Sequence, residues 1–135
     1  MSLTGIDHIQ LAAPPGCEPE ARNFFGRLLE MEEIPKPEPL RSRGGCWFKV
    51  GEKQLHIGIE NDFRPARKAH PAFSVENIQR LYEKLSNAGV RCTWDHAVDD
   101  VRRFYANDPW GNRLEFTEPT SKLTRHHRQS ASDNF

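Results

Sequence analysis

The sequence has 135 residues, and its 19 Lys and Arg balance its 19 Asp and Glu. This length fits one domain of ordinary size, and zero net charge excludes the broad basic surface that nucleic acid requires. No long apolar run and no secretion-signal pattern are present, so we expect a cytoplasmic protein that does not span a membrane. Its three cysteines lack CxxC spacing, which predicts reduced structural thiols.

The first half of the chain changes from strand-like alternation to helical spacing and back. Phe24, Phe25, Leu28 and Leu29 fall on one face of a helix, and prolines break the segment that follows. The predicted elements are a strand at 5–12, a helix at about 19–31, a loop at 35–45 and a hairpin of strands at 46–50 and 54–60.

The second half repeats this plan. An apolar stripe that ends at Gly89 predicts its helix, and Asp108-Pro109-Trp110-Gly111-Asn112 predicts the turn of its last hairpin. The predicted elements are a strand at 70–75, a helix at about 77–88, a strand at 90–95 and a hairpin of strands at 101–107 and 112–118. Residues 120–135 are polar and aperiodic, which predicts a tail outside the core.

Two pairs of segments recur about 60 residues apart. Gln54-Leu55-His56 resembles Arg113-Leu114-Glu115, and the strand that carries His8 matches the segment that begins at His70. Each of these four positions holds a side chain that can bind a metal ion. A single His in a strand is more often a structural residue, but four such residues at repeated positions predict a metal site.

Strand alternation indicates where these four side chains point. His56 lies between Leu55 and Ile57, and Glu115 lies between Leu114 and Phe116, so both are expected to face away from the helix-covered side. Within each half, a right-handed crossover through the helix can make the first and last strands neighbours. We therefore expect His8 near His56 and His70 near Glu115.

Several motifs resemble the vicinal oxygen chelate superfamily, which includes glyoxalase I, extradiol dioxygenases, methylmalonyl-CoA epimerase, and fosfomycin and bleomycin resistance proteins. The resemblance covers about residues 4–119. The motifs that carry it are Asp7-His8-Ile9-Gln10-Leu11, the helix with Phe24-Phe25-Gly26-Arg27-Leu28-Leu29, the strand that begins at His70, and the hairpin from Phe104 to Phe116.

The resemblance implies an α+β fold in which two βαβββ modules form an open, cup-shaped mixed barrel. It implies a single domain over residues 1–119, with modules at about 4–60 and 69–118. A divalent ion (Ni, Co, Fe, Mn or Zn) would bind at the positions of His8, His56, His70 and Glu115. Glyoxalase I carries Glu or Gln where this chain has His56, whereas other relatives use only the remaining three positions.

The resemblance and the strand pattern also predict the residues that act on a substrate. Arg103, Tyr105 and Asn107 share one strand face, and Tyr105 matches a substrate-contacting tyrosine of the fosfomycin enzymes. Arg103 either pairs with a substrate carboxylate or phosphonate or is a solvated strand residue. We expect Phe48 to line the substrate wall. The predicted catalytic residues are Glu115, Tyr105 and Glu60, with Glu115 or Glu60 as the general base.

The leading hypothesis is a metal-dependent enzyme that acts on a small, oxygen-rich substrate chelated through adjacent oxygens. A lyase, an isomerase or a ring-cleaving dioxygenase would fit this chemistry. The alternative is a non-catalytic drug-binding or antibiotic resistance protein of the bleomycin or fosfomycin type. Relatives of this length usually form homodimers, so a homodimer without nucleic acid or membrane partners is expected.

Overall fold

The computed structural model describes residues 1–119, so the predicted tail at 120–135 lies outside the described residues. The described residues divide into two compact units. The N-terminal unit comprises residues 5–70 and 107–113, and the C-terminal unit comprises residues 1–4, 71–106 and 114–119. Among these residues, no helix combines the length and apolar character needed to cross a bilayer.

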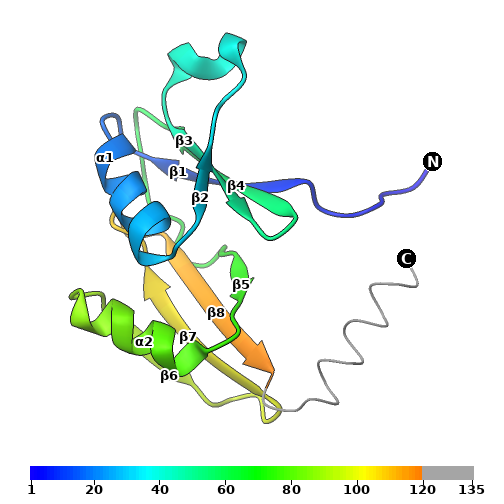
Figure 1. Cartoon of the computed structure of the whole chain (residues 1–135), viewed down its shortest axis with the longest axis vertical. Helices are drawn as coiled ribbons and strands as arrows, with labels where there is room; N and C mark the ends of the chain where they lie inside the picture. The colour runs from blue at the N-terminus through cyan, green and yellow to red at the C-terminus, as the bar shows by residue number, and fades with distance from the viewer. Residues whose placement is uncertain (120–135) are drawn as a thin grey trace. The chain divides into compact units, whose positions relative to one another are not determined.

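The N-terminal unit contains a four-stranded mixed sheet (Figure 1). Its elements are β1 (His8–Ala13), α1 (Glu18–Ala21), η1 (Arg22–Leu28), β2 (Glu32–Ile34), η2 (Glu38–Arg43), β3 (Cys46–Val50) and β4 (Lys53–Ile59). The strand order is β1-β4-β3-β2, with β1 parallel to β4 and the other pairs antiparallel. The first and last strands of the predicted module are therefore neighbours.

The C-terminal unit repeats this arrangement with its own sheet. Its elements are β5 (Ala72–Ser74), α2 (Ile78–Asn87), β6 (Cys92–Asp95), β7 (Val101–Asn107) and β8 (Arg113–Pro119). The strand order is β5-β8-β7-β6, and β5 again pairs in parallel with β8. The predicted α+β class and the two repeated modules are confirmed.

Strand register shows that the internal repeat of the sequence is structural. Gln10 pairs with His56 across β1 and β4, and Ala72 pairs with Glu115 across β5 and β8. His8 precedes Gln10 by two residues, as His70 precedes Ala72. The candidate ligands thus occupy equivalent positions in the two modules.

Each sheet buries one face against its helix. In the N-terminal unit, Phe25 of η1 packs on Phe48 of β3 with 5.9 Å between ring centroids. In the C-terminal unit, Tyr82 of α2 packs on Trp94 and Phe104, at 4.9 and 5.6 Å between ring centroids. These aromatic contacts form the apolar core of each unit.

The first predicted helix is not a regular α-helix throughout. It begins as α1, with Pro19 in its first turn, and continues as the π-helical segment η1. The backbone N–H of Leu29 donates to the carbonyl of Phe24, five residues earlier, which is the wider π spacing. Both Phe24 and Phe25 are fully buried, so this turn serves to place them on the sheet.

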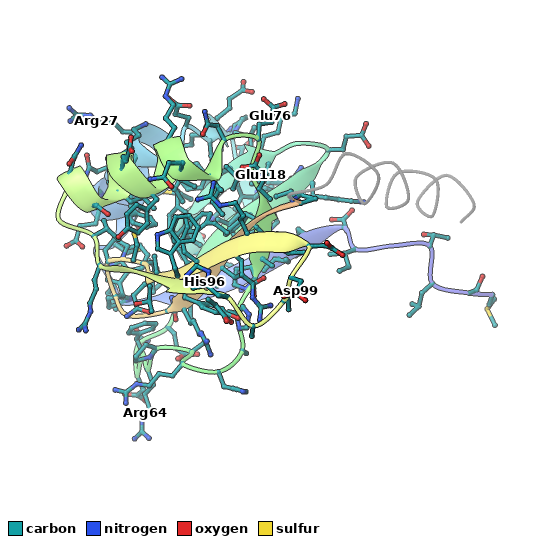
Figure 2. All side chains as sticks on the ribbon, turned by 90° about the horizontal axis from the view of Figure 1, so that it is seen from below. Arg27, Arg64, Glu76, His96, Asp99 and Glu118 are labelled. Atoms are coloured by element: carbon teal, nitrogen blue, oxygen red, sulfur yellow. The ribbon has the colours of Figure 1, made fainter. Side chains whose placement is uncertain are left out.

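The second helix follows the sequence prediction closely. The Asn77 side chain caps its N-terminus by accepting from the backbone N–H of Arg80. Glu118 of β8 accepts from the N–H of Ile78 at 2.8 Å, and Figure 2 shows its carboxylate near this end of α2. A carboxylate at the N-terminus of a helix also opposes the positive end of the helix dipole.

Asn112 holds three separate backbone segments of the N-terminal unit together. Its side-chain oxygen accepts from Ala66 N–H at 2.9 Å, and its amide nitrogen donates to the carbonyl of Ala12 at 2.8 Å. The same nitrogen donates to Asp108 at 2.7 Å. Burial raises the pKa of Asp108, although donors from Asn112 and Trp110 oppose this rise. The sequence predicted only a turn here, because neither distant partner is visible in the local pattern.

Replacement of Asn112 tests this junction. Asn112→Ala would leave the part-buried Ala66 N–H and Ala12 carbonyl without this partner and would remove one donor from the buried Asp108 carboxylate, at a cost of about 2–4 kcal/mol. Urea unfolding would measure this loss. Asn87→Ala, at an exposed position, serves as control and should change stability by no more than about 0.5 kcal/mol. An equal effect of both substitutions would contradict the assignment.

Candidate functional site

Three aromatic rings from neighbouring strands stack in the N-terminal unit. The His56 ring lies against Trp47 with 3.8 Å between centroids and 3° between planes. Its other face lies against His8, at 4.1 Å and 20°. The predicted approach of His8 to His56 is therefore confirmed, and His56 is enclosed between two rings with only 4% of its surface exposed.

The ring nitrogens of these two histidines have different partners. His8 donates from Nδ1 to the Asp7 carboxylate at 2.9 Å, and this bond lowers the pKa of Asp7. In the neutral ring, the lone pair of His8 is then on Nε2. His56 instead donates from Nε2 to Gln54 Oε1 at 2.9 Å. Burial and the adjacent His8 lower the pKa of His56, which favours its neutral form.

His70 lies two residues before β5 rather than on it. The predicted strand at 70–75 is shorter because Pro71 supplies no N–H; its carbonyl accepts from Glu115 N–H at 3.0 Å. Strand alternation therefore does not determine where His70 points. The exposed ring donates from Nδ1 to the Lys68 carbonyl at 2.8 Å, which puts the lone pair of the neutral ring on Nε2.

Glu115 lies on β8 of the C-terminal unit beside a second charged pair. Its carboxylate is 3.9 Å from Nη1 of Arg103, and it is nearly buried. Arg103 Nη2 donates to Asp95 at 2.8 Å. The hydrogen bond from the Ala97 N–H and, to a smaller extent, the one from Arg103 lower the pKa of Asp95. Arg103 and Glu115 are therefore neighbours in the C-terminal sheet, a pairing that the sequence did not predict.

The remaining substrate-binding candidates lie along β7. The Arg103 guanidinium is 5.8 Å from the centroid of the Tyr105 ring, so these two side chains are adjacent. Arg103 Nε is buried without a hydrogen-bond partner among the described residues. Arg103 is thus a paired, half-buried residue, and not the solvated one that the sequence left open. Asn107 is exposed at the end of β7.

Phe48 requires a correction, because it lies in the core and does not line the face that carries His56. Its side chain is fully buried against Phe25. Trp47, which the sequence did not single out, pairs with His56 across β3 and β4. A two-residue turn at Gly51-Glu52 fixes this register, so correct placement of the turn could have identified Trp47.

The other candidate base, Glu60, follows β4 and is exposed. Its backbone N–H donates to the carbonyl of Ala13 at 2.9 Å. This bond continues the pairing of β1 with β4 by one residue and fixes the backbone of Glu60, while its carboxylate remains accessible.

Some of the candidate ligands have the bonding that a divalent ion requires. Taken singly, neither unit groups three or more His, Cys, Asp or Glu side chains around one point within residues 1–119. The bonding of His8 and His70 nevertheless matches metal-binding histidines, which donate one ring N–H to a carboxylate or carbonyl and coordinate through the other nitrogen. Two imidazoles and the Glu115 carboxylate suit a borderline divalent ion. His56 also donates one ring N–H, to an amide oxygen, but its ring is enclosed between Trp47 and His8.

Comparisons with known proteins show the family of the chain. The family model described as Glyoxalase/Bleomycin resistance protein/Dioxygenase superfamily matches residues 5–116. A solved glyoxalase family protein from Bacillus anthracis is 55% identical, with a TM-score of 0.86 over 88% of this chain and 98% of that one. No protein of curated function matches the sequence.

Two more distant structures share the fold. A fosfomycin resistance protein from Listeria monocytogenes is 18% identical, with a TM-score of 0.73 over 93% of this chain and 98% of that one. A lactoylglutathione lyase from Agrobacterium tumefaciens is 14% identical, with a TM-score of 0.69 over 87% and 96%. These two similarities concern the fold alone.

The three cysteines differ in burial, and alkylation of their thiols tests this difference. All three are free, and burial raises the pKa of Cys46 to about 11. At pH 8 roughly one Cys46 in a thousand is then a thiolate, a fraction that grows about tenfold per pH unit. Iodoacetamide at pH 8 should label the partly exposed Cys92 first, as measured by peptide mass spectrometry. Labelling of Cys46 at the rate of Cys92 would contradict its burial; in guanidinium all three should react.

Proposed function

Because the chain belongs to the Glyoxalase/Bleomycin resistance protein/Dioxygenase superfamily, we propose that it is a metal-dependent enzyme. Its substrate is a small, oxygen-rich molecule that binds through two adjacent oxygens. Lyase, isomerase and ring-cleaving reactions all use such binding, and the proposal covers these three classes. We further propose that the protein acts in the cytoplasm as a homodimer.

The proposed metal ligands are His8, His70 and Glu115. The observation that carries this assignment is the shared bonding of the two histidines, which fixes Nδ1 as donor and leaves the lone pair on Nε2. Glu115 supports it because its carboxylate is nearly buried at the position that corresponds to His56 in the repeat. The proposal requires only that these residues reach one ion, whether from one chain or from two copies.

The charge of this ligand set suits an anionic or enolising substrate. A bound divalent ion (Ni, Co, Fe, Mn or Zn) would polarise the substrate oxygens as a Lewis acid. Two neutral imidazoles and one carboxylate cancel only part of its charge. Arg103 on β7, with Nη1 3.9 Å from the Glu115 carboxylate on β8, adds a positive charge beside this proposed ligand.

The residues of β7 are proposed to orient the substrate. About a quarter of the Arg103 side chain is exposed, so its guanidinium can donate to a substrate oxygen. Its Nη2 is held by Asp95, which fixes the plane of the guanidinium. Tyr105 lies beside it and Asn107 follows on the same strand. Arg103 therefore binds as a pre-positioned donor and not as a mobile surface charge.

Proton transfer is proposed to involve the carboxylates. Glu115, steadied by Arg103, would take a substrate proton if it leaves the ion during the reaction. Glu60 is the second candidate base because its backbone is fixed while its side chain is accessible. Tyr105 would donate to, or accept from, a substrate oxygen.

Bound-metal analysis tests the proposed ligands. After loading with Ni, Co, Fe, Mn or Zn and removal of excess ion, wild type should hold about one ion per chain. His8→Ala, His70→Ala and Glu115→Gln should each retain less than about a tenth of this amount, because each removes one donor. Elemental analysis by mass spectrometry gives the readout.

A control variant distinguishes the loss of a metal ligand from a general loss of folded structure. His96→Ala should leave the metal content unchanged because His96 is an exposed side chain on the segment after β6 (Figure 2). Absence of stoichiometric metal from wild type after every supplementation would contradict the proposal. Thermal stabilisation by a basic glycopeptide that a chelator does not alter would instead favour the non-catalytic drug-binding alternative.

A further inference from the structure

His56 occupies the middle of a three-ring stack on one sheet face. Trp47 and His56 are directly paired across β3 and β4. His8 lies two residues before Gln10, which pairs with His56, so it is the diagonal neighbour on the adjacent strand. Diagonal neighbours on a sheet are within reach of aromatic side chains. The stack is therefore a consequence of strand register, and its three members come from three consecutive strands of the sheet.

The geometry of the stack prevents His8 and His56 from sharing an ion. An imidazole binds a metal in the plane of its ring, with the ion about 3 Å from the ring centroid. The two rings are 4.1 Å apart and inclined at 20°, so their planes meet only roughly 10 Å away. An ion in the plane of His8 is consequently too far from the plane of His56.

The hydrogen bonds of His56 agree with this conclusion. Its Nε2 donates to Gln54, and Trp47 covers the ring face that points away from His8. His8, in contrast, is held at Nδ1 by Asp7 and has 44% of its side chain exposed. His56 is thus covered by a ring on each face, whereas nearly half of the His8 side chain is exposed.

We propose that His56 is a positioning residue and not a metal ligand. Its ring, fixed by Trp47 and Gln54, holds the plane of the His8 imidazole, while Asp7 selects the tautomer of His8. This inference rests on the proposed function, because it assumes that His8 binds the ion. The role requires a flat ring at position 56 and does not require a donor atom there.

Two substitutions at position 56 give opposite results under the two roles. His56→Phe keeps a flat ring but removes both nitrogens, whereas His56→Gln removes the ring but keeps an oxygen donor that can bind a divalent ion. A positioning role predicts that His56→Phe binds Zn²⁺ within about threefold of wild type. The same role predicts that His56→Gln binds Zn²⁺ about 10- to 100-fold more weakly than wild type, as expected when support for a ligand is lost. A ligand role predicts instead that His56→Gln binds Zn²⁺ more tightly than His56→Phe.

The measurement is a chelator-competition titration of the metal-free protein with Zn²⁺. Co²⁺ gives a second readout, because its visible absorption reports its ligands: the spectrum of His56→Phe should match that of wild type. Loss of Zn²⁺ by His56→Phe to the level of His8→Ala would overturn the positioning role and leave the proposed function intact. Retention of Zn²⁺ by His8→Ala would instead overturn the proposed function.

Control variants keep the test decisive if a position-56 variant fails to fold. Trp47→Leu leaves both His56 nitrogens in place but removes its support, so positioning predicts weaker Zn²⁺ binding, and unchanged binding would contradict it. His96→Phe is the matched control: His96 also stacks on a tryptophan, Trp94, at 6.5 Å and 17°. The His96→Phe variant should bind Zn²⁺ as wild type does. Circular dichroism confirms folding of each variant.

Discussion

The parallel pairing of the first and last strands in each module is the constraint on which the candidate site depends. β1 joins β4, and β5 joins β8, each through a crossover that contains a helix. This pairing places His8 diagonally beside His56, and it gives Glu115 the position in the second sheet that His56 has in the first. Without it, residues about 50 positions apart in the sequence would have no fixed relation.

The two sheets use equivalent positions in different ways. In the N-terminal unit, the position on the last strand holds a histidine enclosed by rings. In the C-terminal unit, it holds a carboxylate beside Arg103, with Asp95 completing the charged group. An enclosed ring supports a neighbour by packing, whereas a nearly buried carboxylate requires a compensating charge. The two copies of the repeat thus share one strand arrangement but carry different chemical groups at the equivalent position.

Much of the fold was predictable because its signals are local. The helical stripe of α2, the turn around Gly51 and the alternation of Leu55, His56 and Ile57 all depend on nearby residues. The exact length of the turn between β3 and β4 sets their register, and a shift of one residue exchanges the two faces of a strand. For this reason Phe48 was placed on the wrong face and Trp47 was missed. Pro71 shortens β5, so the alternation assumed for His70 does not apply.

A crystal structure of the Zn²⁺-loaded protein tests the central claim most directly. The account predicts the ion at about 2.0–2.2 Å from Nε2 of His8, Nε2 of His70 and a carboxylate oxygen of Glu115. It also predicts that the His56 ring stays stacked between Trp47 and His8 and makes no bond to the ion. An ion bound through His56, or bound without His8 and Glu115, would contradict the account.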